Sequence, residues 1–132
     1  MKKSLAVFLS IAALALLFST CAKKSTTSNS ECISNFMSDI NSADRSGVYN
    51  NLDSNSSKYN QAKVASYWNS QFPTQDMPYT LSGQSSGNPI YATLSSSNGL
   101  YNGNPIIFGM ASDSDGNAVI SSISLNGTSI FD

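Results

Sequence analysis

The spacing of apolar residues changes once along this chain, near Pro73, and that change limits the fold more than any other feature. Before Pro73, apolar side chains recur every three or four residues, as on one face of a helix. After it, they occur in short alternating runs bounded by Gly, Asn and Pro. Helices followed by strands predict an α+β domain, with the N-terminal helices packed on a curved antiparallel sheet.

Three helical segments are expected before Pro73. The first starts at about Ser30, which is its expected N-cap. A second short segment covers residues 44–52, and a third runs from Ser57 to Gln71, where the proline ends it. The apolar stripe of the first segment consists of Ile33, Phe36, Met37 and Ile40, and that of the third consists of Val64, Trp68 and Phe72.

Five short strands are expected after Pro73, because each run is rich in β-branched or aromatic residues. They cover residues 79–82, 90–95, 105–112, 119–125 and 128–131. The sequence Asp113-Ser114-Asp115-Gly116-Asn117 predicts a turn between the two longest strands. It does not predict a calcium loop, since Ala111 and Ser122 fall where the first and last ligands would stand.

The beginning of the chain differs in character from the rest. Lys2 and Lys3 precede an apolar run from Leu5 to Phe18 that is interrupted only by Ser10. This run is shorter than the ~20 residues that a transmembrane helix needs. A positive start, a short apolar run and small polar residues after it are typical of a secretory signal. We therefore predict that residues 1–20 are a signal peptide.

A cysteine follows this run directly, and Leu17-Phe18-Ser19-Thr20-Cys21 resembles the lipobox of bacterial lipoproteins. Phe18 and Thr20 depart from the commonest lipobox residues. The resemblance implies cleavage between Thr20 and Cys21, lipid on the Cys21 thiol, and a membrane-anchored protein of the cell envelope. An outer-membrane or cell-surface location is expected rather than the inner membrane. The alternative is a disulfide between Cys21 and Cys32 in a secreted protein.

The segment after the cysteine is polar and without periodicity. Residues 21–30 are therefore predicted to be a flexible tether, followed by one domain over residues 31–132. Five basic and eight acidic residues follow residue 20, which gives a net charge of about −3. No cluster of basic residues is present to bind phosphates, so nucleic acid is not an expected partner.

Two parts of the domain carry a second resemblance. Both parts are similar to nuclear-transport-factor-two-like, or cystatin-like, lipoproteins. The first part consists of Phe36-Met37 to Ile40-Asn41 and Ala43 to Tyr49, and the second consists of Ile106 to Met110 and Gly116 to Ile123. In that superfamily a curled sheet packs around the first helix. Ala118 falls near a position where the superfamily often has tryptophan. The resemblance implies a cone or cystatin-like fold.

The residues that could carry chemistry are few. The chain has no histidine, so histidine-based catalysis and the commonest metal ligand are absent. We expect no catalytic residue, no metal and no cofactor. Four carboxylates could act as bases, those of Asp39, Asp44, Asp53 and Asp76. Their surroundings are polar and turn-like, so we expect them instead to be solvent-exposed residues that cap helices and turns. The densest aromatic group either lines a pocket or, as we favour, fills the core: Tyr67, Trp68, Phe72 and Tyr79.

Three functions remain open at this stage. The favoured one is a non-catalytic accessory or binding lipoprotein, attached to the membrane through Cys21 and contacting an envelope protein or a small ligand. The second is a small-molecule-binding or enzymatic cone, which requires a pocket behind Trp68. The third is an inhibitor of a secreted enzyme, which requires an exposed apolar loop at Leu100-Tyr101.

Overall fold

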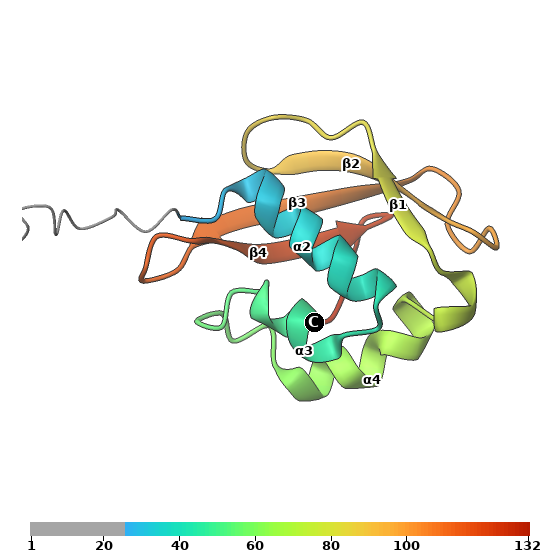
Figure 1. Cartoon of the computed structure of the whole chain (residues 1–132), viewed down its shortest axis with the longest axis horizontal. Helices are drawn as coiled ribbons and strands as arrows, with labels where there is room; N and C mark the ends of the chain where they lie inside the picture. The colour runs from blue at the N-terminus through green and yellow to red at the C-terminus, as the bar shows by residue number, and fades with distance from the viewer. Residues whose placement is uncertain (1–25) are drawn as a thin grey trace, which may run out of the picture.

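A computed structural model describes residues 26–132, in which three helices pack on a five-stranded antiparallel sheet that is not closed (Figure 1). The predicted α+β class is confirmed. The helical elements are α2 (Asn29–Asn41), α3 (Arg45–Asn50), α4 (Gln61–Gln71) and the 3-10 turn η1 (Thr74–Asp76). The strands are β1 (Tyr79–Ser82), β2 (Ile90–Ser96), β3 (Asn104–Ser112), β4 (Ala118–Leu125) and β5 (Thr128–Ser129).

Helix α2 begins earlier than the sequence indicated, because Ser28 and not Ser30 is its N-cap. The Ser28 hydroxyl accepts a hydrogen bond from the Glu31 backbone N–H at 3.2 Å, and the Glu31 carboxylate accepts one from the Ser28 N–H at 3.3 Å. This reciprocal pair satisfies two of the free N–H groups at the helix start. Residues 28–30 therefore belong to the domain, and the predicted tether to residue 30 is too long.

Helix α4 begins later than predicted, at Gln61 rather than Ser57. Asn60 is its N-cap, with the side-chain oxygen accepting from the Lys63 N–H at 2.9 Å. The preceding residue Tyr59 is buried, and its hydroxyl accepts a hydrogen bond from the Ile123 N–H at 3.0 Å. Tyr59 thus anchors the connection to β4, and the helix starts only after it.

The sheet is a simple meander in the order β1-β2-β3-β4-β5, and all neighbours are antiparallel. A register shift interrupts the β3–β4 pairing between Gly109 and Met110. The last predicted strand is shorter than expected and ends at Ser129. The Ile130 N–H still donates to the Ile123 carbonyl at 3.1 Å, and the side chains of Ile130 and Phe131 are buried in the core.

One core lies between the helices and the inner face of the sheet. Phe36 of α2 packs edge-on against Phe108 of β3, with ring centroids 5.9 Å apart. Trp68 of α4 stacks on Phe131 at 6.3 Å and also lies beside Phe72 at 6.4 Å. Among the described residues, the members of this core run from Cys32 to Phe131.

The edge at β1 is covered by a side chain. Asn41, the last residue of α2, donates to the Tyr79 carbonyl at 2.9 Å and accepts from the Tyr79 N–H at 2.7 Å. One amide side chain thus replaces a neighbouring strand at this position. An unpaired strand edge promotes aggregation, so the contact protects the domain.

Strand β5 pairs only with the end of β4, at Ser124 and Leu125, and backbone from outside the sheet covers the earlier part of β4. The Ala118 N–H donates to the Thr27 carbonyl at 2.9 Å, and the Ile120 N–H donates to the Asn51 carbonyl at 2.8 Å. The Ile120 carbonyl in turn accepts from the Asp53 N–H at 2.8 Å. Segments before α2 and after α3 therefore occupy this edge.

Candidate functional site

The aromatic residues singled out in the sequence do not line an open pocket. Trp68, Phe72 and Tyr79 lie in the core with almost no exposed surface. The Tyr79 hydroxyl donates to the Pro73 carbonyl at 2.7 Å, so its polar group is satisfied internally. Tyr67, by contrast, is 39% exposed on the outside of α4. Three of the four side chains therefore fill the core.

The Leu100-Tyr101 loop is only partly exposed. The Tyr101 ring packs against Phe72 with centroids 6.3 Å apart, and its hydroxyl donates to the Gln71 carbonyl at 2.6 Å. Leu100 is 44% exposed. A single exposed leucine beside an anchored tyrosine is ordinary surface and not an extended apolar loop.

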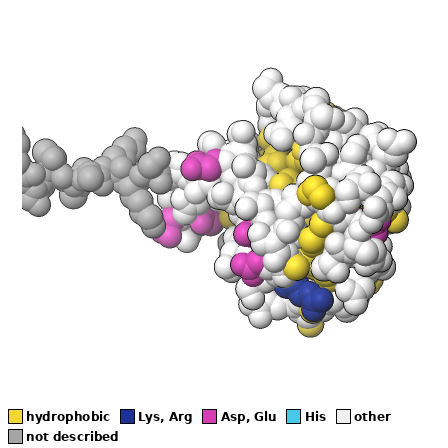
Figure 2. Space-filling view, turned by 45° about the vertical axis from the view of Figure 1, so that its right-hand side comes forward, with side chains coloured by type: hydrophobic (Ala, Val, Ile, Leu, Met, Phe, Trp, Pro, Cys, Tyr) yellow, Lys and Arg dark blue, Asp and Glu magenta, His cyan; other side chains and the backbone are white. Residues whose placement is uncertain are grey.

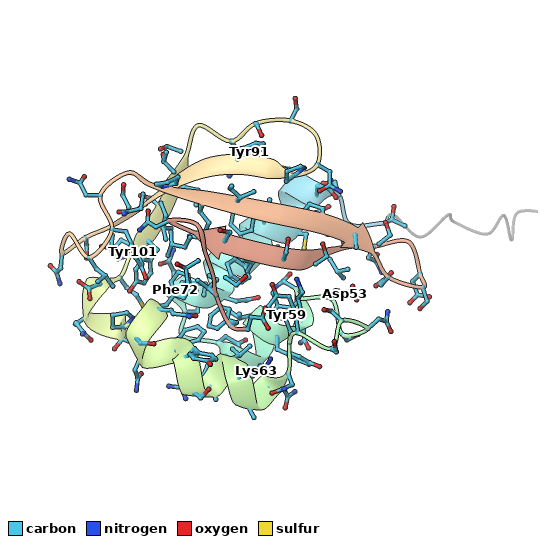
Figure 3. All side chains as sticks on the ribbon, turned by 180° about the vertical axis from the view of Figure 1, so that it is seen from behind. Asp53, Tyr59, Lys63, Phe72, Tyr91 and Tyr101 are labelled. Atoms are coloured by element: carbon cyan, nitrogen blue, oxygen red, sulfur yellow. The ribbon has the colours of Figure 1, made fainter. Side chains whose placement is uncertain are left out.

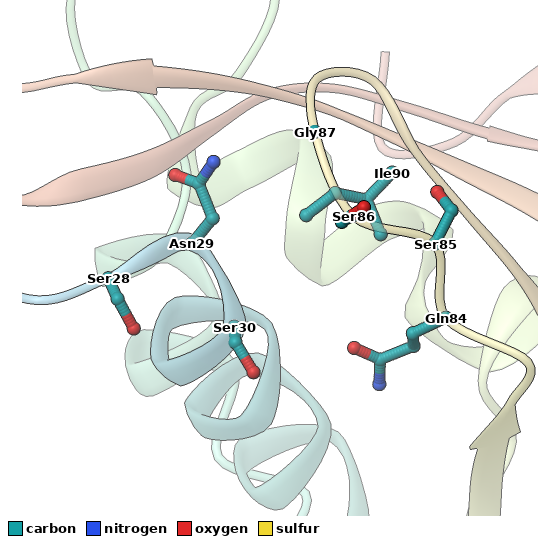
Figure 4. Close-up of a pocket in the computed structure, with 8 residues that line it drawn as sticks. All are labelled: Ser28, Asn29, Ser30, Gln84, Ser85, Ser86, Gly87 and Ile90. Atoms are coloured by element: carbon teal, nitrogen blue, oxygen red, sulfur yellow. The ribbon is translucent and has the colours of Figure 1, made fainter.

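A groove of about 470 Å³ lies between the start of α2 and the β1–β2 loop (Figure 4). One wall comes from residues 28–30 and the other from residues 84–87, with Ile90 between them. Figure 4 shows the Ser30 and Gln84 side chains directed toward each other from opposite walls. The sequence did not indicate this groove, because two segments far apart in the chain form it.

The chemistry of the groove is polar and uncharged. It is lined by Ser, Asn, Gln and Gly residues together with Ile90, and none of them is ionisable. The Ser85 hydroxyl accepts from the Tyr91 N–H at 2.9 Å. Within residues 26–132, the side chains of Asn29, Ser30 and Gln84 form no hydrogen bond, so they are available to a ligand. Such donors and acceptors suit an uncharged polar ligand.

The carboxylates singled out in the sequence are spread over the helical layer. Asp44 is the N-cap of α3 and accepts from the Gly47 N–H at 2.9 Å. Asp39 accepts from the Asn51 side chain at 2.8 Å, and burial raises the pKa of its carboxyl group. Asp53 accepts from a backbone N–H two residues ahead, and Asp76 lies in η1. No group of three or more metal-binding side chains occurs among the described residues.

Cys32 is a buried thiol on α2, as expected for a small apolar residue. Its Sγ lies 3.7 Å from the Asn51 carbonyl oxygen. Burial raises the pKa of the Cys32 thiol from 9.0 to about 11. Cys21, its partner in the alternative disulfide, lies outside the described residues.

We expect Cys32 to be unreactive in the folded protein. A pKa two units above the ordinary value lowers the thiolate fraction about 100-fold at neutral pH, and burial also excludes the reagent. In a Cys21→Ser variant at pH 8, labelling by a thiol reagent should be at least ~100-fold slower than after unfolding in urea. Rapid labelling of the folded variant would show that Cys32 is accessible.

The predicted turn at residues 113–117 is present between β3 and β4. The Asp113 carboxylate accepts from the Asn117 N–H at 2.8 Å, and the Asn117 side chain is the main cause of the lowered pKa of Asp113. The Asn117 side-chain oxygen also accepts from the Thr27 N–H at 3.3 Å. The start of the described chain is therefore fixed to this hairpin.

The predicted signal peptide, residues 1–20, and the cleavage and lipid site at Thr20 and Cys21 lie outside the described residues. Between residues 26 and 132, no helix is long and apolar enough to cross a membrane. Comparisons of the chain with models of protein families, with curated proteins and with solved structures give no match.

Proposed function

We propose that this chain is a lipid-anchored protein of the bacterial cell envelope, attached through Cys21, whose domain binds a partner or ligand without catalysis. The resemblance of the segment from Leu17 to Cys21 to a lipobox supports the anchor. Thr27 indicates which end of the domain the anchor would hold. It is fixed to the β3–β4 hairpin only six residues after Cys21. Six extended residues reach about 20 Å. Lipid on Cys21 would therefore hold the hairpin end of the domain close to the membrane.

The groove supports a binding role at this end of the domain. Its wall at residues 28–30 follows Thr27 directly, so a ligand in the groove would lie near the membrane surface. General acid–base catalysis needs a titratable group within hydrogen-bond reach of the substrate. None of the described residues that line the groove is titratable, although the Glu31 carboxylate accepts from the Ser28 N–H beside it, and the amides and hydroxyls of the lining favour an uncharged polar ligand of the envelope.

The cone or cystatin-like fold remains part of this proposal. Helices that precede an antiparallel meander, with the longest helix α2 crossing the sheet, support it (Figure 1). We also propose the outer membrane or the cell surface as the location. Neither alternative function gains support, because Trp68 is fully buried and Tyr101 is packed against the core.

Replacement of Cys21 tests the anchor. When the full chain is expressed in a diderm bacterium with radiolabelled palmitate, the wild type should carry label and sediment with membranes. Cys21→Ser should lose the label and appear in the soluble fraction, because no other site in the proposal holds lipid.

Cys32→Ala is the matched control, since it removes the other cysteine of the chain. It should keep both the label and the membrane location. Unlabelled Cys21→Ser that still sediments with membranes would contradict the proposed anchor and point to an uncleaved apolar segment.

A further inference from the structure

We propose that Asn126 is a site of self-modification, at which the backbone nitrogen of Gly127 attacks the asparagine side chain and converts it to aspartate or isoaspartate. The two residues form the tight turn between β4 and β5, since Leu125 pairs with Thr128. The backbone φ angles are +52° at Asn126 and +78° at Gly127, as in a type I′ turn. Both residues are exposed, and the proposal does not depend on the lipid anchor.

The reaction needs only solvent as a co-reactant. The Gly127 N–H gives its proton to a solvent base, and the nitrogen forms a bond with Asn126 Cγ. The bond between Cγ and Nδ2 then breaks, and Nδ2 leaves as ammonia after taking a proton from water. Water opens the resulting cyclic imide at either carbonyl, which gives aspartate or isoaspartate. Glycine suits the attacking position because it has no side chain to obstruct the approach.

The structure places a hydrogen-bond donor where this reaction needs one. Negative charge develops on Asn126 Oδ1 during the attack, and the Asn104 side chain donates to that atom at 3.1 Å. A donor already aimed at an oxygen that gains charge lowers the barrier. The Gly127 N–H donates to no group among the described residues, so its nitrogen can attack without first losing a contact.

Two other asparagine–glycine pairs, Asn98-Gly99 and Asn102-Gly103, lie between β2 and β3. In both, the glycine N–H already donates a hydrogen bond, to the Ser96 carbonyl at 3.4 Å in the first and to the Ser95 hydroxyl at 2.9 Å in the second. Among the described residues, no group donates to the side-chain oxygen of either asparagine. The structure therefore distinguishes Asn126 from two pairs of the same sequence.

The main group of acidic side chains lies at the other end of β4. Figure 2 shows acidic side chains gathered near the beginning of the described chain. That beginning is bound to the hairpin at residues 113–117, and the eight residues of β4 separate the hairpin from Asn126. Nearby negative charges oppose the loss of a proton, so this separation favours the attack.

The product would loosen the end of the chain. Isoaspartate carries an extra methylene in the backbone, which the tight turn cannot accommodate while Leu125 stays paired with Thr128. The residues that follow hold Phe131 in the core, where its ring stacks on Trp68 at 6.3 Å. Figure 3 shows this part of the chain running from the sheet toward α4, beside Phe72. The fluorescence of Trp68, the only tryptophan, should therefore change as isoaspartate accumulates, and a constant signal would contradict this loosening.

Peptide mass spectrometry of the full chain, kept folded in mild detergent at mildly alkaline pH, tests the proposal. Proteolytic peptides report the loss of the amide at each of the three asparagines over time. Asn126 should convert fastest. In Asn104→Asp its conversion should be roughly 2- to 10-fold slower, the range expected for the loss of one hydrogen bond. This variant keeps the acceptor of the Asn102 N–H, which lies 2.6 Å from Asn104 Oδ1.

Unfolding in urea provides the matched control, because only the folded chain holds Asn104 beside Asn126. In urea the three asparagines should convert at similar rates, and Asn104→Asp should have no effect. Circular dichroism in the absence of urea verifies that the variant is folded. The proposal is overturned if Asn126 converts no faster than Asn98 and Asn102 in the folded wild type. A folded Asn104→Asp variant with an unchanged rate at Asn126 overturns it equally.

Discussion

Replacing Trp68 by alanine is expected to lower the free energy of unfolding by about 3–5 kcal/mol. The Trp68 side chain has no exposed surface, stacks on Phe131 and lies beside Phe72. The Arg45 guanidinium lies 5.7 Å from its ring centroid and covers it on the helical side. Alanine would leave a cavity where α3, α4 and residue 131 meet. Urea unfolding followed by circular dichroism measures the loss.

Trp68→Phe provides the control, because it keeps an aromatic ring in the same place. The buried Trp68 Nε1 has no hydrogen-bond partner among the described residues. An unsatisfied buried N–H costs about 1–3 kcal/mol, so its removal offsets part of the lost packing. Trp68→Phe should therefore be much less destabilising than Trp68→Ala. Equal losses for the two variants would show that the ring does not determine the stability of this region.

The apolar pattern predicted the three α-helices and five strands and their order, because burial in this domain follows the helix and strand periods closely; it did not predict the 3-10 turn η1. The stripe of Ile33, Phe36 and Ile40 is buried, as are the inward residues of β3. Element ends were predicted less well, because caps determine them. The Ser28 and Glu31 pair was visible in the sequence as a capping signature, but the apolar stripe suggested a start at Ser30.

The sequence did not indicate a structural role for its many asparagines, but in the structure two of them bind the backbone of strands through their side-chain amides. The Asn88 side chain donates to the Met110 carbonyl at 2.8 Å and accepts from the Met110 N–H at 3.0 Å. Asn41 makes the same pair of contacts with Tyr79. Each contact joins residues that are more than twenty positions apart, so no local pattern could indicate it.

The groove and the uncharged face of the sheet opposite the helices were not predictable for a related reason. Residues 77–112 contain no charged side chain, which the sequence shows directly. Only the register of the strands reveals that these neutral residues lie on adjacent strands of one sheet, where Tyr91 pairs with Ile107. The groove likewise depends on a serine-rich loop that happens to lie beside the start of α2.

Replacing Asn41 by alanine is expected to lower the free energy of unfolding by about 1–3 kcal/mol, the sum of two lost hydrogen bonds. Tyr79 is buried, so its backbone N–H and carbonyl have little access to water once the amide side chain is removed. Asn69→Ala on the exposed side of α4 is the matched control, since alanine raises helix propensity at both positions.

The difference between the two variants therefore isolates the contact with Tyr79, and urea unfolding measures it. Because the contact also covers the edge of β1, Asn41→Ala should aggregate more readily than Asn69→Ala at equal concentration on heating. Light scattering during a thermal ramp records that difference. Equal stability and equal aggregation of the two variants would mean that water replaces the Asn41 amide without cost, and that the β1 edge needs no cover.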